Sequence, residues 1–345
     1  MPADPSPAAA RVALPPEGGA VAVAPGVHWV RMPLPFALDH INLWLLEDGD
    51  GWTIADTGYN SEATRALWLR LFDGVLAGRP VHRVLCTHFH PDHMGLAGWL
   101  VGRTGATFAT SLTEWLYGRA LSLDTSELAV PPTLSFYRRA GAPEAVMERL
   151  AVWATAYRAS VSPIPAVLHR LRDGDRPMIG GVPWRVVVGR GHAPEQVCLH
   201  AADRRVLIAG DQVLERISPN VSVWPNEPDA DPLGDFLDSI AALTATIPDD
   251  VLILPSHGVP FTGLHARLAA LAAHHAERLN TCRAACDRPH TAWEVTRALF
   301  TRDLDPHQMR FAVGETLAHL NHLVHRGALH RHRPDDGGAD RYVAR

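Results

Sequence analysis

A short run of metal-binding residue types directly behind an apolar segment is the feature that most constrains this chain. The segment VHRVLC (81–86) lacks clean alternation of polar and apolar residues, which is typical of a strand buried on both faces. It leads into THFHPDH (87–93), where three imidazoles and one carboxylate fall within six residues. Such a set is costly in an apolar core, but a loop that leaves a strand can fold it around two adjacent cations. The candidate ligands in this run are His88, His90, Asp92 and His93.

Three further strand-like segments also end on a candidate ligand. WRVVVGRGH ends at His192, RVLIAGD at Asp211 and VLILPSH at His257. Strands that lie side by side bring their ends to one edge of a sheet. A histidine taken singly would be an ordinary residue, because the chain has 20 of them. The joint pattern, with all seven candidates at strand ends, predicts one metal centre.

The donor types limit the metals that this centre could hold. Imidazole nitrogen and carboxylate oxygen suit zinc, and they also suit iron and manganese. We therefore expect two divalent metal ions, with zinc placed ahead of iron and manganese.

Charge and composition exclude several other classes. The net charge is −5 over 345 residues, so no bulk cationic field attracts nucleic acid or an anionic membrane. All 32 basic residues are Arg, which excludes a Schiff-base lysine and a phosphate-loop lysine. The sequence has no span of about 18 apolar residues of the kind that a membrane helix requires. We expect a cytoplasmic protein, with a homo-oligomer as an open alternative.

Strand and helix patterns alternate through most of the chain. Strand patterns cover 27–34 and 41–58, with a turn at Asp48 to Gly51, and helical patterns cover 61–76, much of 95–170 and 233–246. Pro131 and Pro132 are expected to break the helical run that contains them. The alternation predicts a layered α/β domain.

The chain divides into three expected parts. These are a disordered Pro- and Ala-rich leader over 1–25, a catalytic domain over 26–263, and a linker helix with a small winged-helix-like module over 264–345. Within the catalytic domain, 104–180 is expected to be a helical insertion near the site. The last part shows a long helical pattern, helices near 291–300 and 308–326, and a hairpin turning at Asp335 to Gly338. Its histidines at positions 274, 275, 319, 322 and 325 are expected at the surface or in an interface, not as ligands.

The order and residue sequences of these motifs resemble those of the metallo-β-lactamase fold superfamily over about residues 26–263. IADTG with Asp56 resembles its opening strand and turn, and GHAPEQ, GDQV and PSHG resemble its later ligand segments. The resemblance implies a four-layer αββα fold. It also implies that His88, His90 and His192 hold one metal, that Asp92, His93 and His257 hold the other, and that Asp211 bridges the two. Asp56 would orient ligands through hydrogen bonds.

Departures from the pattern narrow the choice within that superfamily. True β-lactamases lack the bridging aspartate, which argues against antibiotic hydrolysis. The oxygen-reducing di-iron members carry Glu where this chain has His90. A glyoxalase II usually reads GHTPGH where this chain reads GHAPEQ, and its basic glutathione site is not visible. The tail resembles the winged-helix-like domain that follows the catalytic domain in one branch of the superfamily.

The resemblance and the ligand set imply a binuclear metallo-hydrolase. A hydroxide bridging the metals would attack a carbonyl carbon, while Asp92 and Asp211 steer protons to the leaving group. The expected substrate is a small acyl compound, as an ester, thioester or lactone. The helices of 104–180 would either line an apolar pocket for it or simply pack on the sheet. Ser218 and Asn220, just past the bridging ligand, would either face the substrate or belong to a connecting loop.

Two other functions remain open. A phosphodiesterase or endoribonuclease would use the same metals, and the winged-helix-like tail favours it. Against nucleic acid, the tail mixes Arg with Asp335, Asp336 and Asp340 and has no basic stripe. The third possibility is an iron-dependent thiol oxygenase or a non-catalytic binding module, although seven intact ligands argue against a degenerate binder.

Overall fold

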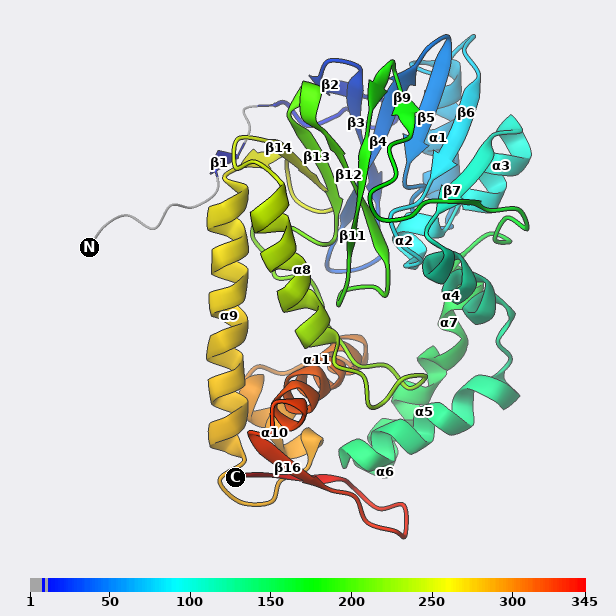
Figure 1. The fold of residues 1–345 in the computed structure, drawn as a ribbon. Coiled ribbons are helices and arrows are strands. Elements are labelled where there is room, and N and C mark those ends of the chain that lie inside the picture. Colours follow the sequence, from blue (N-terminus) through cyan, green and yellow to red (C-terminus); the bar gives the residue numbers. More distant parts are fainter. Residues whose placement is uncertain (1–7, 10–11) are drawn as a thin grey trace.

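Two β-sheets packed face to face form the upper half of the protein in Figure 1. The computed structural model describes residues 8–9 and 12–345. Helices α1 (Glu62–Asp73) and α3 (Ala97–Thr104) cover one sheet, and α8 (Pro232–Thr246) and α9 (Leu264–Ala285) cover the other (Figure 1). The expected four-layer αββα architecture is confirmed.

The first sheet has seven strands in the order β2-β3-β4-β5-β6-β7-β8. They run over Val21–Ala24, Val27–Pro33, His40–Asp48, Gly51–Ala55, Val81–Leu85, Thr107–Thr110 and His169–Arg170. The second sheet has the order β1-β15-β14-β13-β12-β11. Its strands run over Ala8–Ala9, Phe261–Thr262, Leu252–Pro255, Val206–Gly210, Gln196–Ala201 and Arg185–Gly189. A separate ribbon pairs β9 (Met178–Ile179) with β10 (Val182–Pro183).

Strand β4 shows how the sequence builds these layers. Its odd-numbered residues Leu43 and Leu45 pack toward α1, while Trp44 and Leu46 pack between the two sheets. Alternate side chains of a strand point to opposite faces, so one apolar run supplies both cores. All four side chains are fully buried. This explains why the run lacks polar alternation.

The helix predicted over 61–76 is α1. Ser61 is its N-cap, and the Ser61 hydroxyl accepts a hydrogen bond from the Thr64 backbone N–H at 3.1 Å. Pro91 likewise occupies the first turn of the short helix α2 (Pro91–Met94), where the missing N–H leaves nothing unpaired. Local sequence signals therefore fix both helix starts.

The predicted helical insertion contains α4 (Leu112–Leu123), α5 (Ser126–Ala140), α6 (Glu144–Ala151) and α7 (Ala156–Ser160), with a 3-10 turn, η1 (Val152–Thr155), before α7. A second 3-10 turn, η2 (Ala202–Arg204), joins β12 to β13. Strand β7 was not predicted, because its four residues lie between helical patterns and only their pairing with β6 makes them a strand.

The expected break at Pro131 and Pro132 is wrong, because α5 runs through both. The two prolines remove backbone donors, yet the Thr133 hydroxyl donates to the Ala129 carbonyl at 2.8 Å. The following turn also buries Phe136 and Tyr137 in the core shared with α11. Tertiary packing therefore outweighs the loss of helical hydrogen bonds.

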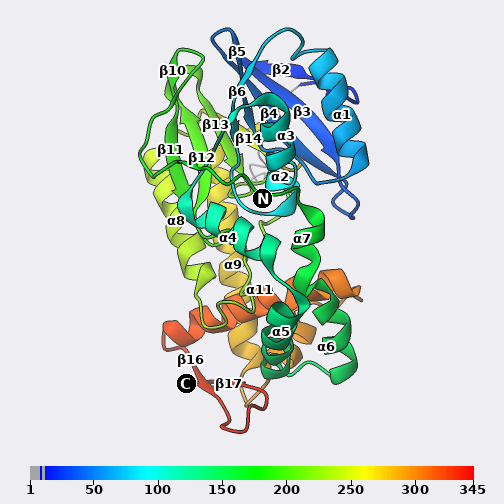
Figure 2. The same cartoon turned by 90° about the vertical axis from the view of Figure 1, so that its right-hand side faces the viewer.

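The C-terminal part follows the predicted order of helices and hairpin. Helix α9 leads to α10 (Ala292–Leu299), α11 (Pro306–His325) and the antiparallel strands β16 (Leu329–His332) and β17 (Arg341–Ala344). Figure 2 shows α11 lying between the sheets and this hairpin. No helix in the described ranges is long and apolar enough to cross a membrane.

One expectation about this architecture is wrong in part. Residues 21–24 of the expected disordered leader form β2, which pairs with β3 and completes the sheet edge; residues 1–7 and 10–11 lie outside the described chain.

Three of the C-terminal histidines, His275, His319 and His322, are buried, in interfaces within the chain. The first two lie in the interface of α9 and α11, where their ring nitrogens are 3.2 Å apart, and His322 faces Asp231, the N-cap of α8. Helical periodicity identifies a common face but does not reveal which helix will cover it.

Candidate metal centre

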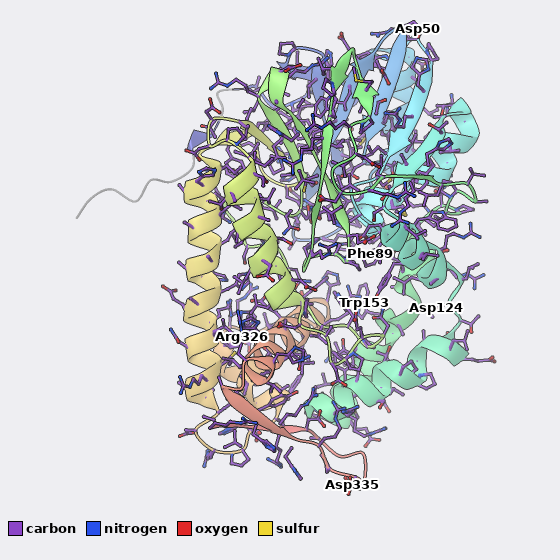
Figure 3. The ribbon with its side chains drawn as sticks, in the orientation of Figure 1. Asp50, Phe89, Asp124, Trp153, Arg326 and Asp335 are labelled. Atoms are coloured by element: carbon purple, nitrogen blue, oxygen red, sulfur yellow. The ribbon has the colours of Figure 1, made fainter. Side chains whose placement is uncertain are left out.

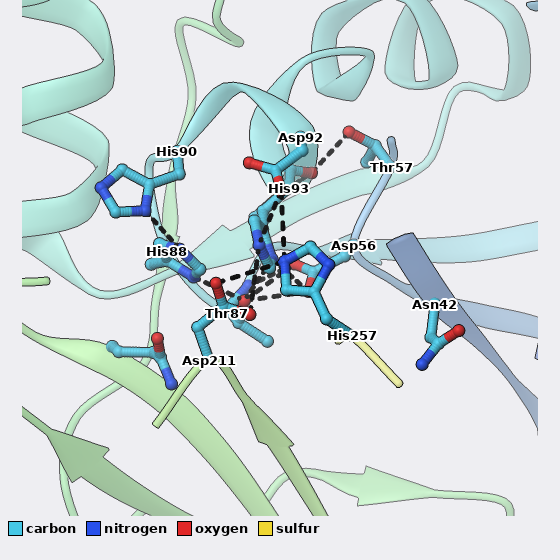
Figure 4. A network of polar contacts seen from close by, with 12 residues as sticks. Asn42, Asp56, Thr57, Thr87, His88, His90, Asp92, His93, Asp211 and His257 are labelled. Carbon is cyan, nitrogen blue, oxygen red and sulfur yellow. Dashed lines mark hydrogen bonds and ion pairs between the residues drawn. The ribbon is translucent and has the colours of Figure 1, made fainter. Parts of the chain in front are cut away.

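The run after β6 folds as a loop that turns into a short helix. His88 precedes α2, His90 is its N-cap, and Asp92 and His93 lie in its first turn. The backbone N–H of His93 donates to the His90 carbonyl at 2.9 Å, which closes the turn. This compact geometry directs all four side chains of the motif to one side, as Figure 4 shows.

The other three candidates follow β11, β13 and β14, as predicted. Gly191, before His192, has φ +96°, and a Cβ there would lie 2.5 Å from the Pro232 carbonyl oxygen. Gly210, before Asp211, has φ +55°. Both turns therefore favour glycine, which lets the chain change direction directly before a candidate ligand.

The structure brings all seven predicted side chains together. Three groups have potential ligand atoms within 4.8 Å of one another: His88, His90 and His192; His88, His93 and Asp211; and Asp92, His93 and His257. Asp211 lies at the centre of the set. Its Oδ2 is 3.4 Å from Nε2 of both His192 and His257, and its Oδ1 is 3.6 Å from Nε2 of His93.

Hydrogen bonds on the outer side of the rings fix their orientation. Nδ1 of His192 donates to the Asn220 carbonyl and Nδ1 of His257 to the His40 carbonyl, each at 2.8 Å. Nδ1 of His93 donates to the Asp56 carboxylate at 2.9 Å. In the neutral rings, Nε2 then carries a lone pair that points inward.

These inward lone pairs test whether cations fit the cluster. Nε2 of His93 and Oδ1 of Asp211 are buried and have no hydrogen-bond partner in the described chain. Nε2 of His88 and Nε2 of His192 face each other at 3.2 Å. Acceptors that converge without donors are unfavourable unless a cation lies between them, so the residues fit divalent metal ions.

Asp56, expected to orient ligands, lies behind the candidate ligands. It follows β5 with φ +63° and is fully buried. Besides His93, its carboxylate accepts hydrogen bonds from the Thr87 backbone N–H at 2.7 Å and from the Thr87 hydroxyl at 2.9 Å. The Thr87 hydroxyl can then accept from Nδ1 of His88 at 3.0 Å. Sequence reasoning missed this role of Thr87.

The pKa values of the clustered side chains depend on burial and on the charges of their neighbours. Burial opposes charge on Asp92, but neighbouring His93 and His257 lower the pKa of Asp92 to about 2. Burial would lower the pKa of His257, but Asp211 and Asp92 raise it to about 10. Burial and the nearby His192 lower the pKa of His90 to about 3. A cation that takes Nε2 of His257 must displace a proton, so affinity on this side rises with pH.

Glu114 of α4 is a second residue that the sequence did not reveal. Its buried carboxylate accepts from the backbone N–H of Phe89 at 2.9 Å and from that of Glu195 at 2.6 Å. One side chain thus holds the loop of His88 and His90 against the loop that follows His192. The Ser111 hydroxyl accepts a hydrogen bond from the Glu114 backbone N–H at 3.4 Å, so the spacing of these two residues marks the start of α4 but not this role of the carboxylate.

The two expected substrate-facing residues lie in the loop after β13. Asn220 contributes its backbone carbonyl to His192, and its side-chain oxygen accepts from the Ser222 hydroxyl at 2.7 Å. Ser218 is half-buried, and its side chain forms no hydrogen bond within the described ranges. Asn220 therefore acts first on the orientation of a candidate ligand.

The two packed sheets and the His/Asp cluster at their edge define the class of metallo-hydrolases. The chain belongs to the metallo-beta-lactamase superfamily, whose family model matches residues 37–258. A second model, the metallo-beta-lactamase-like C-terminal domain, matches residues 279–345.

Similar proteins cover nearly the whole chain. A beta-lactamase domain protein from Burkholderia ambifaria is 44% identical, with a TM-score of 0.89 and 97% of each chain covered. A metallo-beta-lactamase family protein from Thermus thermophilus is 33% identical, with a TM-score of 0.80, covering 94% of this chain and 100% of the other. "Probable metallo-hydrolase YqjP" from Bacillus subtilis (strain 168) is 25% identical over 85% of this chain and 91% of its own.

Proposed function

We propose that this protein is a binuclear metal-dependent hydrolase that cleaves an ester, thioester or lactone bond of a small acyl substrate. The observation that carries the proposal is the convergence of six His and Asp side chains around Asp211, with Nε2 of His93 and Oδ1 of Asp211 buried and without a hydrogen-bond partner in the described chain. His88, His90 and His192 would hold one ion, and Asp92, His93 and His257 the other. Asp211 would lie between the ions, which we propose to be zinc, with iron or manganese as alternatives.

When bound, two divalent ions supply an acidified water as nucleophile and a positive charge that polarises the carbonyl. The chain's own contribution is orientation and proton transfer. Asp56 and the two backbone carbonyls hold the imidazoles in place. The side chain of Asp92 is 19% exposed, against 9% for Asp211, so Asp92 is the carboxylate better placed to pass a proton to a leaving group.

Ion pairs on the C-terminal hairpin favour a small acyl substrate over nucleic acid. Arg331 and Arg333 pair with Asp229 at 2.8 and 2.7 Å, and Arg333 and Arg139 pair with Asp340 at 3.2 and 3.4 Å. Arginines already neutralised in this way offer little to a phosphate backbone. The winged-helix-like module would therefore serve packing and pocket formation. The proposed compartment is the cytoplasm, where the four buried, unpaired cysteines stay reduced.

The test combines metal content with turnover in the wild type and His257→Ala. Acyl-CoA, aryl ester and lactone substrates would be assayed beside bis(p-nitrophenyl) phosphate, with His330→Ala on the exposed face of β16 as control. We expect His257→Ala to lose one metal equivalent and on the order of 100-fold in turnover, because it removes a ligand. Unchanged activity would refute the two-metal assignment, and turnover of the phosphodiester alone would refute the acyl substrate.

A further inference from the structure

Arg310 of α11 carries a guanidinium for which the described part of the chain provides no anion. Its Nε is buried and has no hydrogen-bond acceptor, and no carboxylate of the described chain pairs with it. Burial lowers the pKa of Arg310, and Tyr137 is the ionisable neighbour that opposes this shift. Arg310 as a whole is half-buried, and partial desolvation of an unpaired cation is costly, so this position favours an anionic partner from outside the protein.

Aromatic rings pack against this guanidinium but do not accept its hydrogen bonds. Its central carbon lies 4.7 Å from the ring centre of Phe311, 5.3 Å from Trp153 and 5.6 Å from Trp224. Such cation–π contacts attract the guanidinium to the ring faces. They offer ring faces but no acceptor atoms for the five N–H bonds. The result is a rigid, positively charged group with free hydrogen-bond donors.

Two of these aromatic residues belong to segments that also support the metal centre. Trp153 is one turn before Tyr157, whose hydroxyl donates to the Phe89 carbonyl at 2.6 Å, between His88 and His90. Figure 3 shows Trp153 in the space between Phe89 and α11. Trp224 lies four residues after Asn220 in the loop between β13 and α8, and the Asn220 carbonyl accepts a hydrogen bond from His192.

A third segment reaches the same place from the other side of the centre. Phe36 stacks on His307 of α11 with ring centres 5.3 Å apart, and His307 contacts Trp153 at 4.9 Å. The loop of Phe36 ends at His40, whose carbonyl orients His257. The N-terminal half of α11 therefore packs against segments that hold candidate ligands on both sides of the centre. Arg310 lies among these segments.

We propose that Arg310 is a specificity-determining residue that binds an anionic group of the substrate, a carboxylate or phosphate at the end remote from the scissile bond. The inference rests on the proposed hydrolase function and deepens it. The planar guanidinium can give two parallel hydrogen bonds to a carboxylate or phosphate, which a neutral chain end cannot accept. The C-terminal module thus contributes directly to substrate selection.

The test compares two aryl esters of similar length, p-nitrophenyl glutarate with a terminal carboxylate and p-nitrophenyl valerate without one. Dephospho-CoA and CoA thioesters of one acyl group form the phosphate arm. The metal-loaded wild type is expected to prefer an anionic member of a pair by roughly 10- to 100-fold in kcat/KM. Arg310→Gln is expected to lose that preference through a higher KM, with the neutral substrate unchanged. Arg310→Lys should restore part of it, and exposed Arg302→Gln should keep all of it.

Binding gives a readout that does not depend on catalysis. Glutarate and inorganic phosphate would be titrated calorimetrically into the wild type and Arg310→Gln, and at least one is expected to bind the wild type roughly 10-fold or more tightly. Equal binding of these anions by the wild type and Arg310→Gln would overturn the inference. An equal loss of kcat/KM for the anionic and neutral substrates in Arg310→Gln would overturn it as well. If no ester or thioester is turned over, the hydrolase proposal fails, and the titration alone decides the role of Arg310.

Discussion

Asp56 illustrates at the residue scale how a candidate ligand is held by a group that need not touch a metal. Its carboxylate accepts hydrogen bonds from Thr87 and His93 in a fully buried position. Asp56→Asn keeps the shape but presents one donor where an acceptor is needed. We expect metal affinity to fall by roughly 10- to 100-fold, as measured by competition with a chromophoric chelator.

The matched control for this change is Asp50→Asn, on the exposed hairpin at the far end of β5. The Asp50 side chain is 85% exposed, so its replacement should leave metal affinity unchanged. An Asp56→Asn protein that binds metal as tightly as the wild type would show that the hydrogen bond to His93 has no orienting role.

Glu114 predicts a pH dependence of stability. Burial raises its pKa to about 7 from 4.5, despite two backbone donors. The folded chain thus binds this proton more tightly than the unfolded chain, so its stabilising contribution is complete below pH 4.5 and declines as pH rises to about 7. From pH 4.5 to about 7, the free energy of unfolding of the wild type should therefore fall by about 3 kcal/mol relative to that of Glu114→Gln.

Urea unfolding of metal-free protein at several pH values measures this difference. Removing the metals beforehand separates the titration of Glu114 from metal release by the histidines. A difference between the two proteins that stays constant from pH 4.5 to 7 would mean that folding does not raise the pKa of this carboxyl.

At the element scale, α11 and the loop after β13 must approach closely to orient His192. A Cβ at Gly314 would lie 2.9 Å from the Ser222 side chain and 3.0 Å from the Val223 carbonyl oxygen. Gly314→Ala should therefore displace the loop that carries Asn220. We expect a loss of about 1–3 kcal/mol in the free energy of unfolding, together with weaker metal binding.

Gly102 provides the control for that substitution. It lies within α3, and no atom of the described residues lies within 4 Å of a Cβ placed there. Gly102→Ala should be neutral or stabilise the protein by about 0.5–1 kcal/mol, because alanine loses less backbone entropy on folding. Thermal unfolding and metal titration of both variants would distinguish the effects, and a tolerant Gly314→Ala would argue against coupling between α11 and His192.

At the scale of the whole molecule, the second sheet and the C-terminal module share one hydrophobic core. Phe236 and Leu243 of α8 belong to the same cluster as Leu268 of α9 and Leu317 of α11. Because no solvent layer divides these groups, we expect the metal-free chain to unfold in one cooperative transition. Calorimetry together with far-UV circular dichroism would test this, and two separated transitions would contradict it.

The same core predicts the result of a truncation. A piece that ends at Gly263 would expose the apolar face of α8, which α9 and α11 cover in the full chain. We expect this piece to associate or aggregate, as seen by size-exclusion chromatography. A monomeric piece with native-like circular dichroism would instead show that residues 264–345 are energetically independent.

The sequence by itself determined the candidate ligands, the core strands and the starts of the main helices. Those features depend on short-range patterns, such as the motif behind β6 and the Ser61 cap, which one segment contains completely. Only the tertiary structure decided the roles of Thr87, Glu114 and Arg310, the continuity of α5 through its prolines, and the burial of His319. Each of these depends on which distant segment lies against the residue, and local periodicity carries no information about that partner.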